Sequence, residues 1–230
     1  FTVVEGLDNI LGGGLTPERL YLVEGAPGTG KTTLGLGFLL AGAAAGETGL
    51  YITLSETEHE LRAVATTHGW SLDPITLFEM VPEAGFGEDQ EQSLRPTRVV
   101  LDSLSELRLL AQNSIRYRRQ VLALKQFFTA RQCTVLVLDD KSDDGGDLQL
   151  HSVAHGVIAL EQLLLDFGAP RRRLHIVKMR GTQYSGGFHD AEIRPGGLCV
   201  HPRIGTAGHG AAFTPGFVST GQGSLDALLG

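Results

Sequence analysis

The segment GAPGTGKTT, from Gly25 to Thr33, constrains this chain more than any other stretch. It fits the phosphate-loop pattern G-x-x-x-x-G-K-[ST] through Gly25, Gly30, Lys31 and Thr32. Glycines let successive backbone N–H groups wrap an anion, because no Cβ blocks the approach. The lysine reaches outer phosphates, and a threonine hydroxyl is a hard oxygen ligand suited to Mg²⁺. We therefore expect a phosphate cradle made of Gly25, Pro27, Gly28, Thr29, Gly30, Lys31, Thr32 and Thr33.

The residues around this loop supply the required strand–loop–helix frame. RLYLVEG, residues 19–25, is a β-type run, and the apolar stretch 33–46 is long enough for a buried helix. The start of that helix would add its positive dipole end to the phosphate site. The alternative is a glycine turn that matches the pattern by chance, and the frame argues against it.

Length and composition indicate one large α/β domain. The chain has 230 residues, 42% hydrophobic and 20% charged, with a net charge of −7. The negative charge argues against a general nucleic-acid binder. Cys133 and Cys199 lie far apart, which favours a reduced, cytoplasmic setting. The sequence has no signal peptide and no apolar run of about 18 residues, so we expect no membrane partner.

Strand and helix patterns alternate along the chain. This alternation predicts a mainly parallel central sheet flanked by helices, with two antiparallel strand pairs near the C-terminus. We expect strands at 19–25, 49–56, 75–80, 97–104 and 133–140, and helices at 33–46, 57–70 and 114–131. The antiparallel pairs would turn at 168–170 and 195–197.

The connection that follows Met80 lacks a helical pattern. A parallel neighbour usually needs a crossover of about a dozen residues, commonly helical, but VPEAGFGEDQEQSLRP is acidic and has no periodicity. Either this connection is an extended loop, or residues are missing between Leu94 and Arg95. We favour the second interpretation.

Two acidic residues complete a candidate chemical site. Asp102 ends the apolar run Val99–Leu101, so we expect it on a strand neighbouring the P-loop, in the Walker B arrangement. Together, Thr32 and Asp102 would hold Mg²⁺. Glu56, at the end of the strand after the P-loop helix, could orient a water toward the γ-phosphate. The alternative for Glu56 is a charge in the first turn of the next helix, where acids favour the dipole.

These motifs together resemble the KaiC-like branch of the RecA superfamily of ATPases, over essentially the whole chain. The resemblance is carried by EGLDNILGGGL, GAPGTGKTT, YITLSET, VVLDS and KMRGT. It implies a RecA-like P-loop NTPase fold and an ATP- and Mg²⁺-dependent, slowly hydrolysing domain. It further implies a homo-oligomeric ring, a hexamer with nucleotide at the subunit boundaries, acting in signalling with protein partners that the sequence does not identify. The family includes circadian clock proteins but reaches far beyond clocks.

The resemblance also assigns roles to individual residues. Family members often carry two adjacent glutamates after the second strand, but here the pair reads Ser55-Glu56. This departure raises a nucleotide-gated scaffold with little turnover as an alternative. Lys178 and Arg180, in KMRGT, would reach the γ-phosphate of a neighbouring subunit and act in catalysis beside Lys31 and Glu56. The alternative is a solvated β-edge, where lysine is common.

The chain repeats its first motif at its end. EGLDNILGGGL near the start is similar to GSLDALLG at 223–230, which suggests a tandem of two P-loop domains. We expect one ATPase domain at 1–212, then a linker and the start of a second repeat at 213–230. The family places serine/threonine autokinase activity in that second repeat. A DNA-dependent recombinase or motor is less favoured, because the loop Lys141–Gln149, expected near the ring pore, is acidic.

Overall fold

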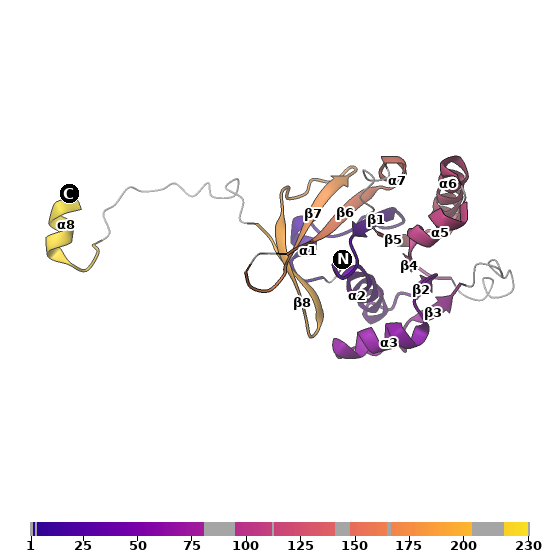
Figure 1. The fold of residues 1–230 in the computed structure, drawn as a ribbon, viewed down its shortest axis with the longest axis horizontal. Helices are drawn as coiled ribbons and strands as arrows, with labels where there is room; N and C mark the ends of the chain where they lie inside the picture. Colours follow the sequence, from indigo (N-terminus) through magenta and orange to yellow (C-terminus); the bar gives the residue numbers. More distant parts are fainter. Residues whose placement is uncertain are drawn as a thin grey trace.

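The computed structural model describes residues 2, 4–80, 95–111, 113–140, 148–164, 167–203 and 219–229. Its strands form one sheet in the order β3-β2-β4-β5-β1-β6-β7-β8-β9 (Figure 1). The strands are β1 Leu20–Gly25, β2 Gly49–Thr53, β3 Thr76–Glu79, β4 Arg98–Asp102, β5 Thr134–Asp140, β6 Gly156–Leu163, β7 Arg171–Met179, β8 His189–Arg194 and β9 Gly197–His201.

The sheet is parallel from β3 to β6, and this part positions the candidate site. β1 lies between β5 and β6, and both pairings are parallel. Every residue of β1 and β4 is buried, which is why these strands read as nearly continuous apolar runs. Because the strands are parallel, their carboxyl ends meet at one edge of the sheet, where the P-loop follows Gly25.

Helices cover both faces of the sheet (Figure 1). Side chains of α1, α2 and α3 belong to one buried apolar cluster, and those of α5, α6 and α7 belong to another on the opposite face. These helices are α1 Leu7–Ile10, α2 Lys31–Ala44, α3 Glu58–Thr67, α5 Leu104–Ala111, α6 Ser114–Ala130 and α7 Leu148–Val153. A further helix, α8 (Gly223–Leu229), is drawn apart from the sheet in Figure 1.

The antiparallel extension is confirmed. β6 pairs with β7, β7 with β8, and β8 with β9, all antiparallel. β8 and β9 form a hairpin that turns at Pro195 and Gly196, and Gly196 has φ 93°, which a glycine adopts without strain. The predicted α/β class, a mainly parallel sheet flanked by helices with antiparallel C-terminal strands, therefore holds.

The strand of Asp102 reaches the P-loop, as expected, because Thr32 Oγ1 lies 3.4 Å from Asp102 Oδ2. β4 is not beside the P-loop strand β1, however, since β5 pairs with both β4 and β1 and so lies between them. A crossover can skip a position in the sheet, so chain order alone does not give strand order. The strand also ends at Asp102 rather than at Leu104. Leu104 instead begins α5, whose apolar residues pack on the face of the sheet that α6 covers.

Three expectations lie outside the described residues. They are the missing-residue interpretation at 94/95, because 81–94 are not described, the domain boundary at 212/213, and most of the acidic loop at 141–149. Within the described ranges, no helix is long and apolar enough to cross a membrane.

Candidate functional site

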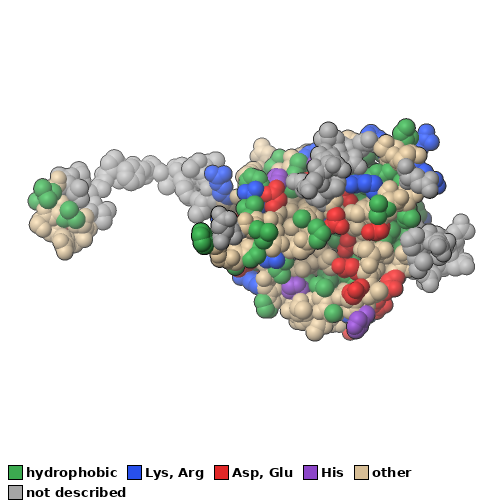
Figure 2. All heavy atoms as spheres, viewed as in Figure 1, with side chains coloured by type: hydrophobic (Ala, Val, Ile, Leu, Met, Phe, Trp, Pro, Cys, Tyr) green, Lys and Arg blue, Asp and Glu red, His purple; other side chains and the backbone are tan. Residues whose placement is uncertain are grey.

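The predicted P-loop residues, Glu56 and Asp102 gather at the carboxyl edge of the parallel strands. Gly25 ends β1, Asp102 ends β4 and Asp140 ends β5, while Glu56 lies in the connection after β2. Figure 2 shows acidic side chains gathered on this face over the region of α2, β4 and β5. The edge therefore combines an anion-binding loop with carboxylates, as nucleotide and metal binding require.

The loop backbone has the conformation that its glycines permit. Gly28 and Gly30 have φ 80° and 104°, and α2 begins at the next residue, Lys31. A Cβ on Gly30 would lie 2.9 Å from Cδ1 of Ile193, and a Cβ on Gly25 would lie 2.5 Å from the Leu160 carbonyl oxygen. Both positions therefore exclude larger residues.

The other predicted cradle residues differ in what they face. Pro27 is exposed at the tip of the loop. Thr29 is buried, and its Oγ1 donates to the Ala26 carbonyl at 2.8 Å, which closes the turn. Thr33 points inward, with Oγ1 3.3 Å from Nε2 of His68. Thr33 can thus offer its backbone N–H to a phosphate, while its side chain contacts the interior.

Lys31 folds back onto its own loop. Its Nζ donates to the carbonyl oxygens of Gly25 and Ala26, at 2.7 and 3.1 Å, and lies 2.8 Å from Oδ1 of Asp140. The side chain is largely buried, whereas the Asp140 carboxylate is half exposed. The ammonium group is therefore held at the mouth of the loop by neutral carbonyls and one anion, all of which an anionic ligand could replace.

The two predicted metal ligands meet across the sheet edge. Thr32 Oγ1 lies 3.4 Å from Oδ2 of Asp102, although β4 and β1 are separated by β5. Tyr51 Oη donates to the same oxygen at 2.6 Å. Burial raises the pKa of Asp102 above its ordinary value, and the Tyr51 hydrogen bond and Lys31 counteract part of that rise. Hydroxyl and carboxylate oxygens form a donor set that suits Mg²⁺.

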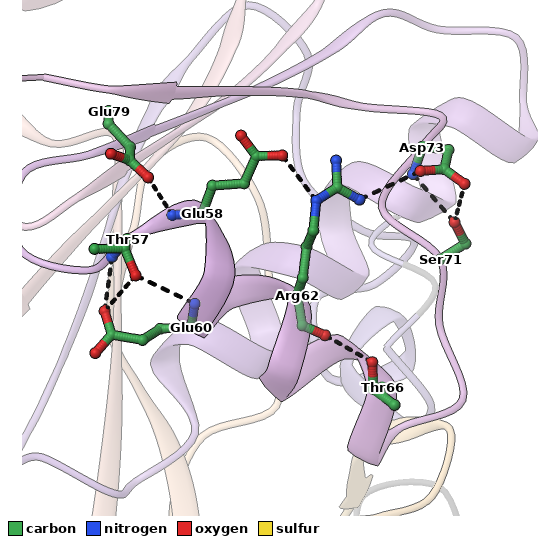
Figure 3. Close-up of polar contacts among 8 residues, drawn as sticks. All are labelled: Thr57, Glu58, Glu60, Arg62, Thr66, Ser71, Asp73 and Glu79. Atoms are coloured by element: carbon green, nitrogen blue, oxygen red, sulfur yellow. Dashed lines mark hydrogen bonds and ion pairs between the residues drawn. The ribbon is translucent and has the colours of Figure 1, made fainter.

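Glu56 lies outside α3, so the first-turn interpretation of this residue is wrong. Thr57 is the N-cap: its Oγ1 accepts from Glu60 N at 3.3 Å, and Glu60 Oε2 accepts from Thr57 N at 2.8 Å (Figure 3). The helix dipole thus acts on Glu58 and Glu60. Thr53 Oγ1 instead donates to the Glu56 carbonyl at 2.8 Å and accepts from its N–H at 3.0 Å, fixing the connection just beyond β2.

The Glu56 carboxylate is partly desolvated. Its Oε2 is buried and has no hydrogen-bond partner among the described residues. Burial raises the pKa of Glu56, the charges of Asp102 and Glu60 raise it further, and Lys31 lowers it. Ser55 beside it is exposed. A carboxylate with a raised pKa and an unsatisfied oxygen, close to the P-loop lysine, is suited to accept a proton or to orient a water.

Lys178 and Arg180 contact α7 of their own chain. Lys178 Nζ donates to the carbonyl of His151, and an Arg180 Nη donates to that of Ser152 at 2.8 Å. Lys125 on α6 donates to the carbonyl of Val153, the last residue of α7, at 2.7 Å. Three cations therefore satisfy carbonyls at the C-terminal end of this short helix. Burial lowers the pKa of Lys178, and the nearby Arg180 lowers it further.

The strand register separates these cations from the P-loop of the same chain. Lys178 pairs with Val157 of β6, whereas Gly25 pairs with Leu160 further along the same strand. Three residues correspond to about 10 Å along a strand, and the P-loop extends beyond Gly25. The alternative of a β-edge for Lys178 holds in part. The described pairing of β8 with β7 covers only Arg172–Leu174, so Lys178 lies on the part of β7 beyond the end of this pairing.

Sequence reasoning missed Asp140 and Tyr51. Asp140 is the charge partner of Lys31, and Tyr51 is the donor to Asp102. The signal for Asp140 was present, because an acid ends the apolar run of β5 just as Asp102 ends that of β4. Tyr51 gave no such signal, since an aromatic residue in a buried strand is usual in a core.

Comparison with known proteins gives matches over most of the chain. The family model of the ATPase KaiC matches residues 1–80 and 88–204. A UPF0273 protein of Thermotoga maritima is 30% identical over 237 residues, covering 90% of this chain and 97% of that protein. The circadian clock oscillator protein KaiC of Synechococcus elongatus is 26% identical over 229 residues, covering 87% of this chain and 44% of that protein.

A solved structure has the same fold. The crystal structure of a KaiC-like protein from Pyrococcus horikoshii superimposes with a TM-score of 0.76 and 25% identity. The match covers 87% of this chain and 97% of that chain.

Proposed function

Because this chain belongs to the KaiC ATPase family, we propose that it binds ATP with Mg²⁺ and hydrolyses it slowly. The observation that carries the proposal is the convergence of four side chains at one sheet edge: Lys31 and Thr32 from the P-loop helix, Asp102 from β4 and Glu56 after β2. The choice of ATP rather than GTP as the nucleotide is inferred from the family.

The residues present fit a magnesium nucleotide. Thr32 and Asp102 supply the hard oxygens that would hold Mg²⁺, directly or through water, and the ion would neutralise charge on the phosphates. The backbone of Gly28, Thr29 and Gly30 would cradle phosphate oxygens. Lys31 would exchange its contact with Asp140 for the outer phosphates.

Glu56 would orient the attacking water and accept its proton. Its unsatisfied buried oxygen and raised pKa support that role. Ser55 stands where family members often carry a first glutamate, so a nucleotide-gated scaffold with little turnover is the second candidate. The substitution Ser55→Glu separates the two: a rise in turnover supports a weakened ATPase, and unchanged negligible turnover supports the scaffold.

Lys178 and Arg180 would act on the nucleotide of a neighbouring subunit in a homo-oligomeric ring, with a hexamer as the proposed state. The register that keeps them from their own P-loop supports action in trans. Their cations would stabilise charge on the transferring phosphoryl group. The ring would serve signalling or regulation through protein partners.

We also propose that α8 begins a second repeat. Thr2 N and Oγ1 both lie 2.7 Å from Asp8 Oδ1. Thr220 N and Oγ1 lie 2.8 and 2.6 Å from Asp226 Oδ1, and in both cases the aspartate follows the threonine by 6 residues. Leu7 is fully buried, whereas its counterpart in α8, Leu225, is 44% exposed. A following domain would bury that apolar face and would be the place for any autokinase activity.

The test measures oligomeric mass and phosphate release, each with and without ATP and Mg²⁺. We expect Mg²⁺-dependent ATP binding, assembly of a ring with ATP, and slow release of phosphate that added DNA does not stimulate. Absence of nucleotide binding would overturn the proposal. Strong stimulation by DNA would favour the recombinase class.

A further inference from the structure

The β8–β9 hairpin carries a cluster of metal-ligating side chains away from the P-loop. Glu192 pairs with Cys199, and Asp190 pairs with His201, so these four residues share one face of the hairpin. The residues that alternate with them along β9, Leu198 and Val200, pack into the core on the other face. The sequence thus brings a thiol, an imidazole and a carboxylate together on one small surface.

The donor atoms of three of these residues lie close together. His201 Nε2 is 2.6 Å from Glu192 Oε1 and 3.9 Å from Cys199 Sγ, and all three donor atoms lie within 4.8 Å of one another. In a tetrahedral zinc site, ligand atoms stand roughly 3–4 Å apart, since bonds are about 2.0–2.3 Å long. Separating the imidazole and the carboxylate by about 1 Å would therefore admit an ion.

We propose that Glu192, Cys199 and His201 form a binding site for a divalent metal ion of the Zn²⁺ class. Sulfur, nitrogen and oxygen donors together select zinc-like ions over Mg²⁺, which prefers oxygen alone. The site is thus chemically distinct from the all-oxygen pair Thr32 and Asp102. Three protein ligands leave a fourth position for water.

The neighbouring charges favour a cation. Glu192 contributes a carboxylate, and Glu5, which forms a β-bridge with Cys199, contributes a second one that is paired with Arg194. Arg194 is the opposing charge, but its guanidinium is paired with the Glu5 carboxylate. The thiolate is the form of cysteine that binds metal ions, so binding of the ion would release the proton of the Cys199 thiol.

The site lies back to back with the phosphate loop. Ile193 and Leu198, on the core face of the hairpin, are the side chains that a Cβ on Gly30 would meet, at 2.9 Å and 3.7 Å. A metal ion that joins β8 to β9 would therefore brace the surface that supports this P-loop glycine.

The test uses Co²⁺ as an optical substitute for zinc, on the untagged chain without nucleotide and in excess Mg²⁺. The excess Mg²⁺ occupies sites made of oxygen ligands alone. The cobalt spectrum therefore reports on the site with sulfur, nitrogen and oxygen donors. We expect the wild type to bind one cobalt ion per chain and to show a thiolate-to-cobalt charge-transfer band.

Cys199→Ser and His201→Gln should each abolish this band. His201 is exposed, so its substitution leaves the core intact. Cys133→Ser, at the other buried free cysteine, and His59→Gln, at an exposed histidine, are the matched controls and should keep the band. Absence of cobalt binding by the wild type, or survival of the band in either site variant, would overturn the proposal.

Discussion

The Tyr51 hydroxyl donates a 2.6 Å hydrogen bond to Oδ2 of Asp102, the oxygen that Thr32 Oγ1 approaches at 3.4 Å. This bond holds a buried carboxylate in one orientation at the end of β4. Burial also raises the pKa of the Tyr51 hydroxyl well above its ordinary value, so Tyr51 remains a donor. Tyr51 is therefore a positioning residue for the proposed metal ligand.

Tyr51→Phe should weaken the response to magnesium. Asp102 would lose its donor, so its orientation would relax and its pKa would rise further. We expect a higher Mg²⁺ concentration for half-maximal ATP turnover, and a loss of about 1–3 kcal/mol in the free energy of unfolding. Tyr184→Phe, in a partly buried ring, is the control. An unchanged magnesium titration in Tyr51→Phe would exclude the positioning role.

Lys31→Ala should remove nucleotide binding and leave the fold intact. The change replaces a cation at the mouth of the loop by a neutral methyl group beside several anionic oxygens. Binding of ATP, measured by calorimetry, should be lost, while the unfolding transition persists. Arg62→Ala removes an exposed cation of α3 and should bind ATP normally. If Lys31→Ala keeps its ATP affinity and turnover, the P-loop assignment fails.

Glu56→Gln should reduce turnover roughly a hundredfold or more, while ATP binding persists. The amide keeps the shape of the side chain but cannot take a proton from water. Glu58→Gln, in the first turn of α3, is the matched control, because it removes a carboxylate that the helix start holds. Full turnover in Glu56→Gln would show that the water is oriented elsewhere.

The raised pKa of Glu56 predicts a pH dependence of stability. A carboxyl whose folded pKa exceeds its unfolded pKa stabilises the fold when protonated, and this stabilisation is lost as pH rises through the folded value. Glu56→Gln should therefore melt at a higher temperature than the wild type at about pH 7, and the difference should vanish below about pH 4. A difference that grows toward acid pH would contradict the raised pKa.

Mixing two inactive variants tests the action of Lys178 and Arg180 across the subunit boundary. Arg180→Ala keeps its own P-loop but cannot complete a neighbour's site, and Lys31→Ala has the opposite defect. Mixed rings contain boundaries with an intact P-loop on one side and intact cations on the other. Partial recovery of ATP hydrolysis is expected in a mixing titration. If labelled subunits are shown to mix and no activity returns, the cations act only on α7 of their own chain.

The local features of this protein were predictable from the chain alone. The P-loop is a contiguous motif whose glycine spacing and lysine express a local backbone requirement, so residues 25–33 could be identified directly. The strands β4 and β5 were predictable because burial on both faces demands nearly continuous apolar residues. The alternation of strand and helix patterns, with the turn residues near the C-terminus, predicted the mainly parallel sheet and its antiparallel extension. The family resemblance then identified this class as a RecA-like P-loop fold.

Apart from the expected meeting of Thr32 with Asp102, the contacts between distant segments could not be derived in this way. Local patterns encode burial and turns, but they do not name partners: nothing near Tyr51 indicates Asp102, and nothing near Lys31 indicates Asp140. The Tyr51–Asp102 pair exists because β2 pairs directly with β4, and the Lys31–Asp140 pair exists because β5 pairs directly with β1. Parallel strands carry the residues at their ends to one edge of the sheet. The order of strands is set by packing of whole helices and strands, which no single segment contains.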